Sequence, residues 1–92
     1  MEIRYKIIFH KEAMKDLSFW KKSGNISAQK KITAILKILQ SDPYHHSMQF
    51  EFLSENLSGY CSRRITKKDR VTYFVNEKNR EVVVARLRGH YS

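Results

Sequence analysis

Residues 60–76, YCSRRITKKDRVTYFVN, decide the predicted fold of this chain. Tyr60 to Thr66 and Arg70 to Asn76 are rich in β-branched and aromatic residues, as strands are, and a polar, basic turn separates them. Glu81 to Leu87 has the same character and follows the polar turn NEKNRE. Because short polar turns join neighbouring strands, we expect these three segments to form an antiparallel meander.

The residues before this meander predict two strands and a helical hairpin. The expected elements are a strand over Glu2–Phe9, a helix over His10–Ser23, a second helix that starts after a cap at Asn25 or Ser27 and ends at Pro43, and a short strand over Gln49–Leu53. The helical residues expected to face the core are Ala13, Met14, Leu17 and Trp20, then Ile32, Ile35, Leu36 and Leu39. Gly24 suits a helix C-cap, and the connection is short enough for an antiparallel pair. The order β-α-α-β-β-β-β is typical of an α+β domain whose antiparallel sheet carries helices on one face.

The composition bounds the class of protein. The chain has 92 residues, 41% hydrophobic and 29% charged, which predicts one globular domain over residues 1–92. A single cysteine, Cys61, excludes an internal disulfide and favours a reducing, cytoplasmic compartment. We expect neither a membrane span nor a secretion signal. The net charge of +9 favours a polyanionic partner, but it does not choose among RNA, DNA, a membrane surface and an acidic protein.

Residues that often carry chemistry give weak signals when taken singly. Cys61 lies inside an expected strand and is most simply a small buried hydrophobe. His45 and His46 are neighbours whose rings should diverge, and no Cys or Asp cluster joins them, so we expect no metal site. His10 precedes a helix and is most simply a surface or capping residue. The chain has only 3 glycines and no glycine-rich phosphate loop, so no cofactor is expected.

The arginines of the first predicted hairpin form a sharper pattern. If residues 67–69 form a three-residue loop, Thr66 lies opposite Arg70 and Arg64 lies opposite Thr72. Arg64 and Arg70 then share a face, whereas Arg63 points to the other face and should matter less. Two guanidiniums on a rigid sheet can clamp a phosphate, because each offers a planar fork of donors. The alternative is a solvated sheet face.

The C-terminal residues 85–92, ARLRGHYS, are the second unusual feature. Gly89 breaks the last strand and can turn His90 away from it. A histidine with an ordinary pKa of about 6.5 is suited to proton transfer near neutral pH. The alternative is a frayed tail.

Together these stretches resemble the YoeB/Txe branch of the RelE superfamily, toxins of bacterial type II toxin–antitoxin modules. The resemblance rests on NLSG at 56–59, the aromatic Tyr60, SRRIT at 62–66, R-V-x-Y-x-V at 70–75 and RLRGHY at 86–91. It implies a microbial RNase-like (RelE-like) fold and a metal-independent mRNA interferase. Such an enzyme cuts mRNA in the ribosomal A site and inhibits translation. In that reaction a ribose 2′-hydroxyl attacks the adjacent phosphate, leaving a 2′,3′-cyclic phosphate and a free 5′-hydroxyl.

The resemblance also assigns roles to individual residues. Glu51 corresponds to the family's general base, although Phe52 follows it where the family commonly has proline. Arg70 would stabilise charge on the scissile phosphate. His90 would be the general acid to the leaving 5′-oxygen, and Tyr91 would help to hold substrate. The residues expected to bind RNA are Arg64, Arg88, Lys67 and Lys68.

The partners implied by the resemblance are a cognate acidic antitoxin, the ribosome with its rRNA, and mRNA. Operator DNA would be contacted only indirectly through the antitoxin complex, and a homodimer is left open. One alternative is a non-catalytic, gyrase-poisoning toxin on the same fold, against which the set Glu51, Arg70 and His90 argues. The other is a basic RNA- or ribosome-binding module. Its stacking candidates would be Tyr60, Tyr73 and Phe74, which are equally suited to a core.

Overall fold

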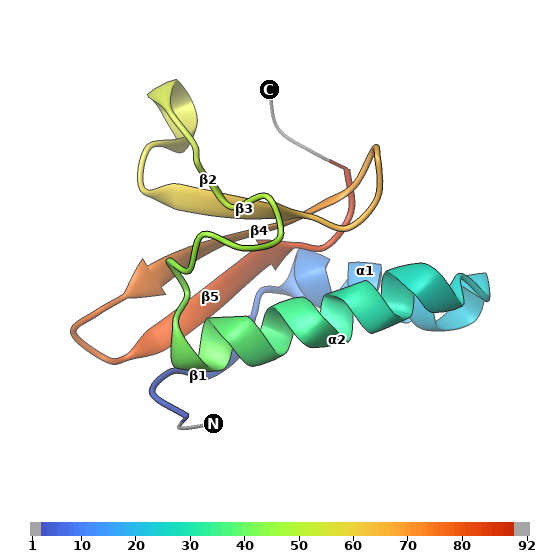
Figure 1. Cartoon of the computed structure of the whole chain (residues 1–92), viewed down its shortest axis with the longest axis horizontal. Coiled ribbons are helices and arrows are strands. Elements are labelled where there is room, and N and C mark those ends of the chain that lie inside the picture. Colours follow the sequence, from blue (N-terminus) through green and yellow to red (C-terminus); the bar gives the residue numbers. More distant parts are fainter. Residues whose placement is uncertain (1–2, 90–92) are drawn as a thin grey trace.

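Five strands form one sheet in the order β1-β5-β4-β3-β2 in the computed structural model, which describes residues 3–89 (Figure 1). The elements are β1 (Lys6–Phe9), α1 (Lys11–Ser23), α2 (Ile26–Ser41), β2 (Glu51–Phe52), a short 3-10 helix η1 (Glu55–Leu57), β3 (Tyr60–Arg64), β4 (Arg70–Asn76) and β5 (Glu81–Arg86). This arrangement confirms the α+β class and the expected order of helices and strands. The bounds of β4 are those predicted, whereas β3 ends two residues earlier than predicted.

The sheet is mixed, so the expectation of a wholly antiparallel sheet was wrong for one strand. The pairs β2–β3, β3–β4 and β4–β5 are antiparallel, as the meander predicted. β1, however, runs parallel to β5, from Lys6 opposite Glu81 to Phe9 opposite Val84. The alternation of residues in a strand is the same in either direction, and this pairing joins segments far apart in the chain. Local sequence therefore did not reveal the direction of β1.

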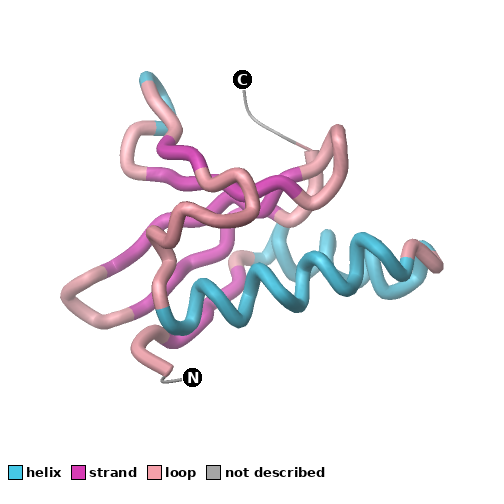
Figure 2. The backbone as a smooth tube through the Cα atoms, in the orientation of Figure 1, coloured by secondary structure: helices cyan, strands magenta, loops and turns pink. Residues whose placement is uncertain are grey.

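The break between the two helices lies where its capping residues predict. Gly24 ends α1 in the left-handed conformation with φ 74°, which costs little without a Cβ. The Asn25 side chain caps α2 by accepting the backbone N–H of Ala28 at 3.0 Å. The helices run in opposite directions and gather on one side of the sheet (Figures 1 and 2). No helix within residues 3–89 is long and apolar enough to cross a membrane.

The core forms between the helices and one face of the sheet. Its main members are Ala13, Trp20, Ile32, Ile35 and Leu39 from the helices, packed with Cys61, Val71, Tyr73, Val82 and Val84 from the sheet. One predicted core residue was wrong, because Met14 is 53% exposed. Asp16 is turned inward instead and is only 4% exposed. The hydrogen bonds that Asp16 makes to β5 and to the segment after it, described below, stabilise its buried carboxylate.

Candidate functional site

Arg64 and Arg70 lie directly opposite each other on β3 and β4, and so share one face of the sheet. The shared face confirms the prediction, but the predicted register, with Thr72 opposite Arg64, was wrong by two residues. Five residues, 65–69, connect the strands instead of three. Thr66 closes this connection by donating its hydroxyl to Asp69 Oδ2 at 2.7 Å and by accepting the backbone N–H of Asp69. The turn therefore takes up two residues that the pattern assigned to a strand.

Glu51 and Arg70 form an ion pair on this face. β2 pairs with β3 so that Glu51 lies opposite Ser62. Arg70 Nη2 is 2.8 Å from Glu51 Oε1, and Arg70 Nη1 donates to the Ser62 hydroxyl at 3.0 Å. These contacts fix the plane of the Arg70 guanidinium beside the Glu51 carboxylate. The Arg70 side chain is 14% exposed and the Glu51 side chain is 55% exposed. A guanidinium has five N–H donors, so others remain to meet an anionic oxygen.

Ser62 is a site residue that the sequence analysis missed. The alternation of β3 puts Ser62 on the same face as Arg64, but the sequence analysis assigned it no role. Ser62 is 1% exposed, and its hydroxyl accepts a hydrogen bond from Arg70 Nη1. The available signal was that this serine begins the motif SRRIT and lies two residues before Arg64, on the same face of the strand.

Arg64 adds a second cation with an unusual environment. Its Nε atom is buried and has no hydrogen-bond partner among the described residues. A buried donor without a partner costs about 1–3 kcal/mol, so this side chain gains stability from any arrangement that gives Nε an acceptor. Lys67 and Lys68 are exposed in the turn between β3 and β4. All three remain predictions as RNA contacts.

The backbone that leads to the C-terminus is bound beside Arg70. The Arg70 N–H donates to Gly89 O at 2.9 Å, and the Gly89 N–H donates to Asp69 Oδ1 at 2.8 Å. Gly89 has φ 69°, a conformation that favours glycine, in agreement with its predicted role in breaking the strand. His90 and Tyr91 lie outside the described residues. Gly89, the residue before His90, is thus held against the Arg70 backbone and the Asp69 side chain.

Helix α1 anchors the same segment from the other side. The Asp16 carboxylate accepts from Arg86 Nε at 2.8 Å and from the Leu87 N–H at 2.9 Å. Trp20 Nε1 donates to Leu87 O at 2.6 Å. The Arg88 guanidinium lies 3.5 Å from the centre of the Phe19 ring on α1. This contact makes Arg88 part of the anchor. The RNA contact expected of Arg88 stays a prediction.

Arg63 points to the opposite face, as predicted, and is 0% exposed. Its guanidinium donates to the carbonyls of Pro43, His45 and Ser47 at 3.1, 2.7 and 2.6 Å. It also donates to the Tyr73 hydroxyl at 3.1 Å. These bonds fasten the loop between α2 and β2 to the sheet. Arg63 therefore sets the path of the chain into β2 and Glu51, an effect that the sequence analysis did not foresee.

Two further expectations concern this loop and the aromatic residues. The expectation that the rings of His45 and His46 diverge was wrong, because they stack with centroids 4.6 Å apart where the loop bends at His46. Tyr73 is a core residue, 0% exposed, whose hydroxyl donates to Pro43 O at 2.6 Å, so it cannot stack a base. Tyr60 and Phe74 are half-buried on the face that carries Glu51.

Cys61 is buried in the core as predicted, and we expect it to resist alkylation in the folded protein. It is 2% exposed, and burial raises the pKa of its thiol to about 11, against a smaller lowering by Arg63. Only the thiolate is nucleophilic, so little reactive form exists at pH 8. Mass spectrometry after iodoacetamide treatment should show no adduct on the native chain and one adduct in denaturant. Rapid labelling of the native chain would contradict this assignment.

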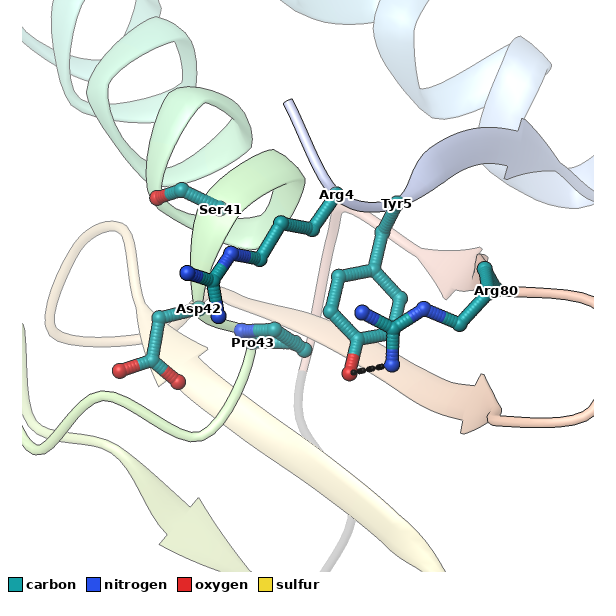
Figure 3. Close-up of a pocket in the computed structure, with 6 residues that line it drawn as sticks. All are labelled: Arg4, Tyr5, Ser41, Asp42, Pro43 and Arg80. Carbon is teal, nitrogen blue, oxygen red and sulfur yellow. Dashed lines mark hydrogen bonds between the residues drawn. The ribbon is translucent and has the colours of Figure 1, made fainter. Parts of the chain in front are cut away.

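A pocket of about 490 Å³ lies apart from these residues, between the N-terminal segment and the end of α2. It is lined by Arg4, Tyr5, Ser41, Asp42, Pro43 and Arg80 (Figure 3). Figure 3 shows the Arg80 guanidinium across the Tyr5 ring, 4.5 Å from its centre. Arg80 and the Tyr5 hydroxyl both bind Glu77, so these polar groups are satisfied within the wall. The pocket contains none of the predicted site residues.

Comparison with known proteins gives one family over nearly the whole chain. Residues 9–91 match the family model described as YoeB-like toxin of bacterial type II toxin–antitoxin system. The chain is 34% identical to Toxin YoeB of Escherichia coli over 86 residues, which are 94% of this chain and 99% of the relative.

Solved structures agree with this match. A YoeB/ParE toxin from Agrobacterium tumefaciens superimposes with a TM-score of 0.84 at 27% identity, over 94% of this chain and 99% of the other. YoeB from Staphylococcus aureus, solved as a dimer and in a YoeB–YefM complex, gives TM-scores of 0.79 and 0.78. The identities are 30% and 31%, and each match covers 96% of this chain and 99% of the other.

Proposed function

Since the chain belongs to the family of YoeB-like toxins of bacterial type II toxin–antitoxin systems, we propose that it is a ribosome-dependent endoribonuclease, an mRNA interferase. It would cleave mRNA in the ribosomal A site without a metal ion and so stop translation. The observation that carries the proposal is the contact at 2.8 Å between Glu51 and Arg70, with Ser62 as the third member. A carboxylate and a guanidinium fixed side by side are two of the three groups that this reaction requires.

The chemistry assigns each group a step. Glu51 takes the proton from the ribose 2′-hydroxyl, whose oxygen attacks the adjacent phosphorus. His90 gives a proton to the departing 5′-oxygen, and Tyr91 helps to hold the substrate. Each of the two proton transfers is worth roughly 10²–10⁴-fold in rate.

The arginines act on the phosphate itself. Negative charge grows on its non-bridging oxygens, and Arg70 and Arg64 would stabilise it. A phosphate can bind the N–H donors of Arg70 that Glu51 and Ser62 do not use, so the ion pair can orient the Glu51 carboxylate while the phosphate is bound.

We assign the partners on the same premise. The Staphylococcus aureus relative was solved with YefM, and an acidic antitoxin of that kind would neutralise a chain of net charge +9. The ribosome and mRNA are the proposed targets, in the cytoplasm where ribosomes are, and operator DNA would be reached only through the antitoxin complex. A dimer is a proposed assembly because the same relative forms one. Each RNA phosphate contacted should add about −0.7 to the slope of log affinity against log salt.

The test of the proposal is cleavage of a defined mRNA on programmed ribosomes. The wild-type chain is expected to leave a 2′,3′-cyclic phosphate and a 5′-hydroxyl at the A-site codon. His90→Gln should lower the rate at least about 10²-fold while ribosome binding stays nearly intact, because glutamine cannot donate the proton. Primer extension and end-group analysis measure the products. If the wild type binds ribosomes and leaves every mRNA intact, the nuclease assignment is wrong and a non-catalytic toxin takes its place.

A further inference from the structure

Three aromatic rings meet on the sheet face that carries Glu51. Tyr60 and Phe74 lie opposite each other on β3 and β4, with ring centroids 5.3 Å apart and planes inclined by 72°. The His10 ring lies 6.2 Å from that of Phe74 at 64°. Tyr60 and Phe74 are half-buried and His10 is exposed. We call these three residues the aromatic row.

His10 is not used where its position in the chain would predict. It is the N-cap residue of α1, a place where Ser, Thr, Asp or Asn usually caps the helix. Its side chain makes no capping hydrogen bond, and its ring lies against Phe74 instead. The ring thus extends the aromatic surface of β3 and β4 beyond the sheet.

The aromatic row lies one step along the strands from the Glu51–Arg70 pair. Tyr60 is two residues before Ser62, which binds Arg70, and Phe74 is two residues after Thr72, which pairs with Ser62. Residues two apart in a strand share a face and are separated by roughly 6.6 Å. A chain of nucleotides whose phosphate lies at Arg70 therefore brings a neighbouring base to this row.

We propose that the aromatic row is a base-stacking subsite for the nucleotide next to the scissile phosphate of single-stranded RNA. Unpaired bases stack on aromatic side chains whatever their identity, because every base has a π-face. The adjoining Arg64 and Arg70 select a ligand that carries phosphate as well as flat rings. The identity of that neighbouring phosphate rests on the proposed function, whereas the stacking itself does not require cleavage.

The experiment measures binding of a short 2′-O-methyl RNA, which lacks the nucleophile and cannot be cut. Fluorescence anisotropy should show that Phe74→Leu weakens the Kd about tenfold, since stacking of one base contributes on that scale. Phe74→Trp should retain the affinity, because it restores an aromatic face. Tyr44→Leu is the matched control, an exposed aromatic residue outside the row, and it should bind as the wild type does.

Probes with a single abasic nucleotide locate the stacked base. At one position, and no other, the abasic probe should bind the wild type and Phe74→Leu equally. The proposal is overturned if Phe74→Leu binds RNA as tightly as the wild type. It is also overturned if Phe74→Trp melts at the wild-type temperature and yet loses as much RNA affinity as Phe74→Leu. It is overturned as well if Phe74→Leu weakens the binding of the antitoxin only. If the abasic probes show the position-specific effect and the wild type nevertheless leaves A-site mRNA intact, the subsite is supported and only the proposed function is wrong.

Discussion

Substitution of Arg70 by alanine is expected to lower the rate of A-site mRNA cleavage by about 10³-fold, at the upper end of the effect of one oxyanion-stabilising donor. The loss should be this large because, in the proposed reaction, the same guanidinium meets the phosphate and orients Glu51, its partner at 2.8 Å. Single-turnover cleavage on programmed ribosomes measures the rate. Induced expression of the variant should also relieve growth arrest, as should expression of Glu51→Ala.

Two further variants separate the role of Arg70 from its charge. Arg70→Lys keeps the charge but loses the planar fork that contacts Glu51 and Ser62 together, so it should recover only part of the rate. Arg80→Ala removes the same charge at an exposed ion pair with Glu77, and its rate should match the wild type. If Arg70→Ala cleaves as fast as Arg80→Ala, Arg70 has no part in the reaction.

Substitution of Arg63 by leucine is expected to destabilise the fold by about 3–5 kcal/mol. Leucine cannot replace the bonds to three loop carbonyls and to the Tyr73 hydroxyl. Without Arg63, these acceptors stay in the interior and lose their charged donor. They can bind water instead only if the loop moves. Native stabilities are about 5–15 kcal/mol, so the loss is a large fraction of the whole. The melting temperature should fall by at least about 12 °C in a chain of this length.

The neighbouring arginine provides the matched control for Arg63. Arg64→Leu changes the same residue type one position along β3, on the opposite face, where the Nε atom has no partner to lose among the described residues. Thermal and urea denaturation should show a loss below about 1 kcal/mol for this variant, in the range of ordinary surface substitutions. Its affinity for RNA should fall instead. Equal destabilisation by the two substitutions would contradict the role given to Arg63.

Much of the fold followed from local pattern because the signals that carry it are local. The strand-forming residues of β4 and the apolar stripe of α2 predicted both elements, and the stripe also predicted the buried face of α2. Gly24 and Asn25 fixed the break between the helices through conformation and capping. Pattern was less able to find where a strand ends, since Thr66 and Ile65 suit a strand and are drawn into the turn by Asp69.

The site was predictable in part for the same reason. Strand alternation put Arg64 and Arg70 on one face. Only the resemblance singled out Glu51, which lies on a strand of two residues. Ser62 and Asp69 escaped notice, because a hydroxyl or carboxylate gains its role only from the group that lies beside it. The same holds for Asp16, which contacts Leu87 across 71 residues.

By itself the sequence determined the order of the elements, the capped helical hairpin, the three-stranded meander and the face that carries the two arginines. Each of these depends on residues close together in the chain, where periodicity and capping act. Only the tertiary structure decided that β1 runs parallel to β5, that Arg63 is buried among loop carbonyls, and that Glu51 pairs with Arg70. These features depend on contacts between residues far apart in the chain. The free energy of such contacts comes from burial and from hydrogen bonds to buried polar groups, so a short stretch of sequence does not reveal which residues will meet.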